Sequence, residues 1–147
     1  MLKASYNFKL KKMKKVLLFF VLTSVLSCDI GGDDVVNFTS ELMSIESVDI
    51  PDEFTFGQTH EITVNYTRPN GCYEFFNFIF QPDGNTRTVA VVDNIFLDEV
   101  CTQVPESASV SFNFEVFSTD TYIFQFYQGS DPAGDDIYLI VEVPVVQ

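Results

Sequence analysis

The sequence predicts an all-β domain in which seven antiparallel strands form a two-layered sandwich. From Leu42 onward, apolar residues recur at every second position, which is the period of a half-buried strand and not of a helix. Turn-forming residues interrupt these runs about every 8–12 residues. The chain also holds 16 phenylalanines. Their rings suit the space between two sheets about 10 Å apart.

The first two strands are predicted from alternation and from the turns that end them. A ragged strand at residues 42–50 ends at Pro51-Asp52-Glu53. The strand at residues 60–67 alternates cleanly and ends where Arg68-Pro69-Asn70-Gly71 turns the chain. Its core face is expected to hold Ile62, Val64 and Tyr66.

Residues 72–81 are predicted to form a strand that is covered on both faces, because aromatic residues occupy both odd and even positions of CYEFFNFIFQ. In a regular strand one face carries Phe76, Phe78 and Phe80, and the other carries Tyr73, Phe75 and Ile79. Residues 82–85 then predict a tight turn, since proline presets φ and glycine accepts a positive φ.

Four further strands are predicted at residues 86–94, 109–117, 121–128 and 136–145. An acidic connection, residues 95–106, separates the first two of them. The inward-facing residues of the last three are Val110, Phe112, Phe114, Val116, Tyr122, Phe124, Phe126, Ile137, Leu139, Val141 and Val143.

This succession of strands resembles an immunoglobulin-like sandwich, in which about seven short strands are separated by regular turns. Two marks of antibody-type domains are missing, since the chain has no tryptophan and no cysteine pair between the second and sixth strands. The predicted organisation is a signal segment at residues 1–27, a flexible acidic tether at residues 28–41 and the sandwich at residues 42–147.

The residues before the sandwich predict export. Lysines precede an apolar run at residues 16–25, which is about half of the ~20 residues that a membrane-spanning helix needs. Val25-Leu26-Ser27-Cys28 resembles the lipobox of bacterial lipoproteins. The resemblance implies that Cys28 receives a diacylglycerol and that residues 1–27 are removed. An ordinary signal peptide that ends near a cysteine is the alternative.

The same resemblance implies a location in the cell envelope, as an outer-membrane lipoprotein held in the membrane by the lipid on Cys28. The acidic stretch at residues 29–34 is similar to the export signal of lipoproteins displayed on the outside of Gram-negative bacteria. Outward display is therefore one expectation. A plain solvated linker is the other.

Two cysteines remain once Cys28 carries lipid. In the oxidising environment outside the cytosol, Cys72 and Cys101 are expected to form a disulfide. Two free thiols or a metal site are the alternatives. A metal site is disfavoured because His60 is the only histidine and no CxxC spacing occurs.

The charge of the chain excludes two classes of partner. All six lysines precede Cys28, so the remainder holds two arginines against 21 carboxylates, a net charge of −19. Binding to nucleic acid needs cations that displace counterions from phosphates, and electrostatic docking on an anionic bilayer needs the same. Neither is expected.

The acidic loops suggest one cofactor, Ca²⁺, and no other is predicted. The candidate ligands are Asp98, Glu99, Asp131, Asp135 and Asp136. Ca²⁺ takes six to eight oxygen ligands, but the spacing of an EF-hand is absent. Solvated loops without metal are the favoured interpretation, so the prediction for cofactors is none and Ca²⁺ is the alternative.

An exposed aromatic surface is predicted where the second faces of three strands meet. It comprises Tyr73, Phe75, Tyr127 and Tyr138, together with Ile123 and Ile140. Such a surface could bind a glycan or another envelope protein. Coverage by a loop or by residues 35–38 is the alternative.

The sequence favours a non-catalytic binding or structural module over an enzyme. No GxSxG nucleophile motif is present, and His60 is expected at a strand edge or surface. A solute-binding accessory of an outer-membrane uptake system is one alternative. A small envelope hydrolase is the other, since an acidic β-protein offers carboxylate pairs.

Overall fold

The computed structural model describes residues 37–147, and this part of the chain is all-β. The predicted signal segment, the predicted lipidation site Cys28 and residues 28–36 of the predicted tether lie outside the described residues. Within residues 37–147 there is no helix that is long and apolar enough to cross a membrane.

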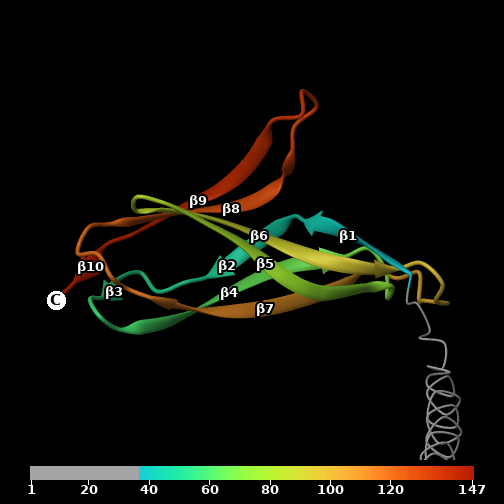
Figure 1. Ribbon diagram of the computed structural model, residues 1–147, viewed down its shortest axis with the longest axis horizontal. Coiled ribbons are helices and arrows are strands. Elements are labelled where there is room, and N and C mark those ends of the chain that lie inside the picture. Colours follow the sequence, from blue (N-terminus) through green and yellow to red (C-terminus); the bar gives the residue numbers. More distant parts are fainter. Residues whose placement is uncertain (1–36) are drawn as a thin grey trace, which may run out of the picture. The chain divides into compact units, whose positions relative to one another are not determined.

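The strands form two main sheets and one short pair (Figure 1). The three-stranded sheet has the order β2 (Ile45–Asp49), β4 (Thr59–Arg68) and β7 (Glu106–Glu115). The five-stranded sheet contains β1 (Phe38–Met43), β5 (Tyr73–Asp83), β6 (Thr86–Phe96), β8 (Tyr122–Ser130) and β9 (Asp136–Val143). A parallel pair joins β3 (Phe54–Thr55) to β10 (Val145–Val146).

Strand β6 is the centre of the five-stranded sheet. One of its edges pairs with β5, from Thr86 to Ile95. Its other edge is shared: Val91–Phe96 pairs antiparallel with β1, and Thr86–Val89 pairs parallel with β8. Beyond this short parallel contact, the β8–β9 hairpin projects away from the rest of the domain (orange and red in Figure 1).

Residues 37–147 form ten strands, not the predicted seven. Six of the predicted strands each overlap mainly with one observed strand, whereas the first, at residues 42–50, spans the end of β1 and all of β2. The predicted arrangement is also wrong in two respects. The sandwich is not entirely antiparallel, since β6 and β8 run parallel and so do β3 and β10. In addition, β6 lies between β5 and β8, which the prediction made neighbours. Alternation fixes which face of a strand is buried and carries no information about which strand lies beside it.

The predicted tether and the first strand also differ from prediction. Residues 38–41 were assigned to the flexible tether, but they belong to β1 and pair with Phe96 to Asp93 of β6. The chain then changes sheets at Ser44, because Met43 pairs in one sheet and Ile45 in the other. Both of these flanking side chains are buried, so the crossing point is anchored on each side.

A β-bulge changes which side chains of β5 share a face, so the predicted assignment of its two faces is wrong. The register with β6 shifts between Phe75 and Asn77, so that Phe76 has no partner on β6. The extra residue reverses the alternation along the strand. Tyr73 and Phe75 therefore share the inner face with Phe78 and Phe80, while Phe76 is 60% exposed.

The core lies between the inner faces of the two sheets and is rich in aromatic rings. Phe54 is fully buried and its ring centroid lies 5.4 Å from that of Phe114 and 6.0 Å from that of Phe124. The pair of Phe54 with Phe124 is edge-to-face, and such pairs stabilise by about 0.5–1.5 kcal/mol beyond the area they bury. The fully buried large residues are Ile45, Phe54, Ile62, Val64, Tyr66, Val89, Val91, Val116, Tyr122, Phe124, Phe126 and Val143. The predicted core faces of β4 and β8 are confirmed.

One charged cluster joins the two sheets through this core. Asp93 of β6 is fully buried; its Oδ1 accepts a hydrogen bond from the Tyr66 hydroxyl at 2.9 Å, and its Oδ2 accepts one from Arg68 Nε at 3.1 Å. Arg68 Nη2 also donates to the Tyr66 hydroxyl oxygen at 3.1 Å. A buried carboxylate is tolerated when it is paired and hydrogen-bonded in this way.

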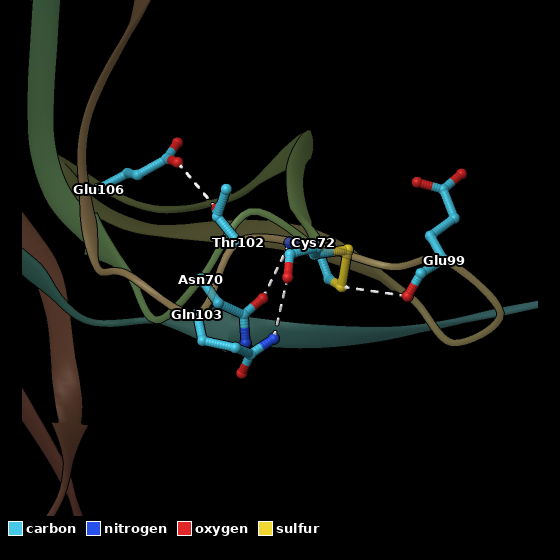
Figure 2. The surroundings of a disulfide bond; sticks show 7 residues. Asn70, Cys72, Glu99, Thr102, Gln103 and Glu106 are labelled. Atoms are coloured by element: carbon cyan, nitrogen blue, oxygen red, sulfur yellow. Dashed lines mark hydrogen bonds between the residues drawn. A yellow bond between two sulfur atoms is a disulfide. The ribbon is translucent and has the colours of Figure 1, made fainter.

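The predicted Cys72–Cys101 disulfide is confirmed, with the two Cα atoms 5.3 Å apart (Figure 2). It joins the start of β5 to the connection between β6 and β7. Asn70 Oδ1 accepts a hydrogen bond from the Cys72 amide at 2.8 Å, and Gln103 Nε2 donates to the Cys101 carbonyl at 3.3 Å. Cys72 Sγ contacts the carbonyl oxygen of Glu99 at 4.0 Å but carries no proton to donate.

Replacing both cysteines, Cys72→Ser with Cys101→Ser, should lower the free energy of unfolding. The bond closes a segment with a sequence separation of 29, and the chain-entropy estimate for a loop of that size is about 3–4 kcal/mol. Denaturant unfolding of the double variant and of the reduced wild type should agree. A wild-type protein whose Cys72 or Cys101 is alkylated without prior reduction would contradict this expectation.

Replacing Tyr66 with Phe should change both stability and its pH dependence. Burial raises the pKa of Tyr66 to about 12 from the ordinary 10.0. Below pH 10 the folded and unfolded chains both keep this proton; from there to about 12 only the folded chain does, so stability falls as the pH rises.

In the Tyr66→Phe variant, the loss of folding stability that the Tyr66 hydroxyl causes between pH 10 and about 12 should disappear. At pH 7 the variant should be less stable by about 1–3 kcal/mol, since Asp93 loses a buried donor. Urea unfolding at pH 7, 10 and 11 measures both effects. Tyr127→Phe, which loses only a hairpin contact with Ser130, controls for the stability change at pH 7.

Candidate functional site: an aromatic groove between two strand edges

A groove of about 530 Å³ lies between the edges of β5 and β7. These two strands end their respective sheets, so the groove opens on one side of the sandwich. Five of its ten lining residues are phenylalanines. The lining consists of Asn77, Phe78, Phe80, Pro82, Arg87, Phe112, Asn113, Phe114, Glu115 and Phe117.

The groove exists because the inner faces of both edge strands carry phenylalanine. The bulge at Phe76 aims Phe78 and Phe80 inward, and regular alternation aims Phe112 and Phe114 toward them. The ring centroids of Phe78 and Phe112 lie 5.1 Å apart, and those of Phe80 and Phe112 lie 5.9 Å apart. These rings form the floor of the groove.

The outer part of the groove remains open to solvent. Phe80 is 40% exposed and Phe117 is 73% exposed. Exposed aromatic rings beside a concave surface are characteristic of sites that bind apolar ligands or partner proteins.

The two edges that border the groove differ in their backbone. On β5, Asn77 Oδ1 accepts a hydrogen bond from the Phe78 amide at 2.8 Å, and Pro82 has no amide hydrogen at all. On β7, all ten residues pair with β4 without a register shift. Within residues 37–147, no strand pairs with the opposite edge of β7.

Arg87 supplies the only positive charge in the lining. Its guanidinium carbon lies 4.9 Å from the ring centroid of Tyr122 and 5.8 Å from that of Phe114, within the range of a cation–π contact. Its Nη1 donates to the carbonyl oxygens of Gly84 at 2.7 Å and Thr86 at 2.8 Å. Among the described residues, the single ion pair is that of Arg68 with Asp93.

The four residues of the predicted binding surface do not share a face. Tyr73 and Phe75 lie on the inner face, and the Tyr73 hydroxyl donates to Glu41 Oε2 at 3.0 Å. Tyr127 and Tyr138 pair on the outer face of the β8–β9 hairpin, with ring centroids 6.3 Å apart. The predicted grouping is therefore corrected, because it depended on a regular β5 next to β8.

Tyr127 and Tyr138 border a smaller hollow of about 160 Å³ on the outer face of the five-stranded sheet. It lies where β1 and β8 diverge along the shared edge of β6, and Ala90 is part of its lining. The Tyr138 hydroxyl donates to Asp136 Oδ2 at 3.2 Å. Burial, followed by the charge of Asp136, raises the pKa of Tyr138.

The predicted Ca²⁺ ligands fall in two separate loops. Asp98 and Glu99 lie in the connection after β6, and the other three lie in or beside the turn of the β8–β9 hairpin. Asp131 Oδ1 accepts hydrogen bonds from the amides of Ala133 and Asp135, at 2.8 and 2.9 Å. Within residues 37–147, no three acidic, histidine or cysteine side chains are grouped so as to hold a metal ion. The Ca²⁺ site stays a prediction.

No site was predicted at the groove. Phe112 and Phe114 were predicted as inward-facing core residues, and Phe78 was placed on one face of a strand expected to be covered on both faces. The sequence does not show that these two strands end their sheets. The only available signal was an excess of phenylalanine over what a core of this size buries completely: Phe54, Phe124 and Phe126 are fully buried, and Phe38, Phe56, Phe76, Phe80 and Phe117 are exposed.

A comparison with protein families agrees with this architecture. The family described as the ORF11 beta-sandwich domain matches residues 62–135, which is half of the chain. The chain belongs to the ORF11 beta-sandwich domain family. The match extends from within β4 to the β8–β9 turn, so it includes both strands that border the groove. No curated protein and no solved structure matches the chain.

Proposed function

We propose that this ORF11 beta-sandwich protein is a lipid-anchored binding module of the bacterial cell envelope and that it binds its ligand in the groove between β5 and β7. The observation that carries the proposal is the groove itself: about 530 Å³, floored by phenylalanine rings and open at Phe80 and Phe117. Binding sites are commonly concave, mostly apolar and supplied with a few polar groups. The polar residues of this lining are Asn77, Arg87, Asn113 and Glu115.

The lining favours binding over catalysis. It contains one carboxylate, Glu115, and no histidine, serine or cysteine. A hydrolase of the glycosidase type needs two carboxylates about 5–10 Å apart. The only histidine, His60, is half-buried. Its Nε2 accepts a hydrogen bond from the Thr55 amide, and its ring packs against Phe54 with ring centroids 4.8 Å apart, so its role is structural.

The anchor follows from the leader sequence. A lipid on Cys28 would hold the domain at the outer membrane, and residues 29–36 would separate it from the bilayer. A binding module in this position could serve an uptake system as its accessory. That role remains the second candidate, because a groove of this size also suits a small solute.

We also propose that the sandwich is a divergent member of the immunoglobulin-like class. In that class the first, second and fifth strands lie side by side. The order β2-β4-β7 reproduces this set. The divergence lies in β6, which occupies the other sheet instead of the position next to β7.

The groove should bind a small neutral aromatic molecule. The full chain, held in lipid nanodiscs, is titrated with indole, whose fluorescence can be read because the chain has no tryptophan. Phe80→Ala with Phe117→Ala should weaken binding by about fivefold or more, since each ring contributes apolar contact area. Phe38→Ala and Phe76→Ala, at exposed rings outside the groove, are the matched controls. Equal binding by all four proteins, after subtraction of empty nanodiscs, would refute the groove as the site.

Replacing Cys28 with Ser should abolish lipid attachment. Mass spectrometry of the wild-type protein should find an acylated Cys28 at the mature N-terminus, and the variant should keep its leader and incorporate no labelled palmitate. The Cys72→Ser, Cys101→Ser double variant should still be acylated. A processed wild-type protein with an unmodified Cys28 would eliminate the anchor.

A further inference from the structure

We propose that the groove binds an extended polypeptide segment of a basic partner, which adds to β7 as the fourth strand of the β2-β4-β7 sheet. This inference rests on the proposed function and names the class of its ligand.

The free edge of β7 is the first reason. Natural proteins usually protect an edge strand with proline, lysine, a bulge or a covering segment. Strand β7 has ten residues, no proline, no lysine and no bulge, and no segment of residues 37–147 pairs with its outer edge. The opposite edge, on β5, is protected by the bulge at Phe76, by the Asn77 side chain and by Pro82. An added strand would therefore pair with β7.

The course of the groove is the second reason. Phe112, Asn113, Phe114 and Glu115 all contribute to its lining. Consecutive side chains of a strand point to opposite faces. A groove lined by four consecutive residues therefore runs along the strand edge itself, where the unpaired backbone groups are. An extended segment in this groove can reach the backbone and the phenylalanine rings together.

The side chains beside the edge define what the added strand should contain. Its inward residues would contact Phe80 and Phe112 and should be apolar. Its outward residues would lie next to a polar row, in which Thr63 and Ser111 hydroxyls are 2.8 Å apart and Ser109 donates to Asn65 at 2.6 Å. Cross-strand pairs of small polar residues extend such rows. The segment should thus alternate apolar residues with threonine or lysine.

Charge selects a basic partner. The described residues hold two arginines against eighteen carboxylates, and Arg68 is already paired with Asp93. Glu106 and Glu115 stand at the two ends of β7. A second copy of this chain would bring like charges together, whereas lysines on a partner would be attracted over several ångströms.

The test uses the full chain in nanodiscs and a ten-residue peptide with valine or phenylalanine at alternate positions and lysine or threonine between them. Binding is measured by calorimetry. A peptide N-methylated on alternate residues should bind at least about tenfold more weakly, because several backbone hydrogen bonds are lost. A peptide with glutamate in place of lysine should also lose about tenfold or more at low salt. Phe80→Ala with Phe117→Ala should weaken binding, and Phe38→Ala should not.

Hydrogen exchange gives an independent readout, since amides of β7 should exchange more slowly with the peptide bound while those of β1 should not change. Equal affinity of the N-methylated peptide would overturn strand addition. Binding of indole without binding of any peptide would overturn the inference and leave the proposed function standing. A concentration-dependent dimer that disappears in the Phe80→Ala, Phe117→Ala variant would assign the groove to a second copy and also overturn it.

Discussion

The backbone pairing of β6 determines most of what is distinctive in this domain. One edge of the strand is occupied by β5, while the other is divided between β1 and β8. Because β5 thereby becomes the outer strand of its sheet, its inner phenylalanines face β7 across an open side of the sandwich. The division of the second edge also explains why the β8–β9 hairpin diverges from β1 and leaves the smaller hollow at Ala90.

The same strand carries the polar link between the sheets. Asp93 of β6 binds Tyr66 and Arg68 of β4, and a buried charge of this kind is stable only with its partners in place. Close to Asp93, at the C-terminal end of β6, the Cys72–Cys101 disulfide joins β5 to the connection that follows β6. The end from which the chain continues toward Cys28 is thus held by a covalent bond and an ion pair. Aromatic packing around Phe54 holds the opposite end, near β3 and β10 (Figure 1).

The sequence predicted those features that depend on local pattern. Six of the seven predicted strands, the buried rows on β4 and β8 and the disulfide are present as expected, while the first predicted strand is divided between the two sheets. The predicted aromatic surface is not formed because of one residue. Phe76 is the extra residue of a β-bulge, and the shift in register places Tyr73 and Phe75 on the inner face. Neither side of that bulge is marked by glycine or proline, so no residue type indicated where the alternation would reverse.

The groove could not be predicted from the alternation of apolar residues either. Phe112 and Phe114 were predicted as core residues and Phe78 and Phe80 as residues of a covered strand face, because a core position and a groove position have the same alternation. Which of them is covered depends on whether another strand lies beyond the edge. That information is contained in the pairing of strands distant in sequence.

The sequence alone thus determined that the chain holds an all-β domain that is strongly acidic and closed by one disulfide, because composition, period and cysteine number are local properties. Only the tertiary structure decided which strands end their sheets, which aromatic rings remain open to solvent and where Arg87 lies among them. The physical reason is that backbone hydrogen bonds between strands are formed by groups common to every residue. Their partners are therefore selected by the packing of the whole sandwich and not by the residues of any one strand.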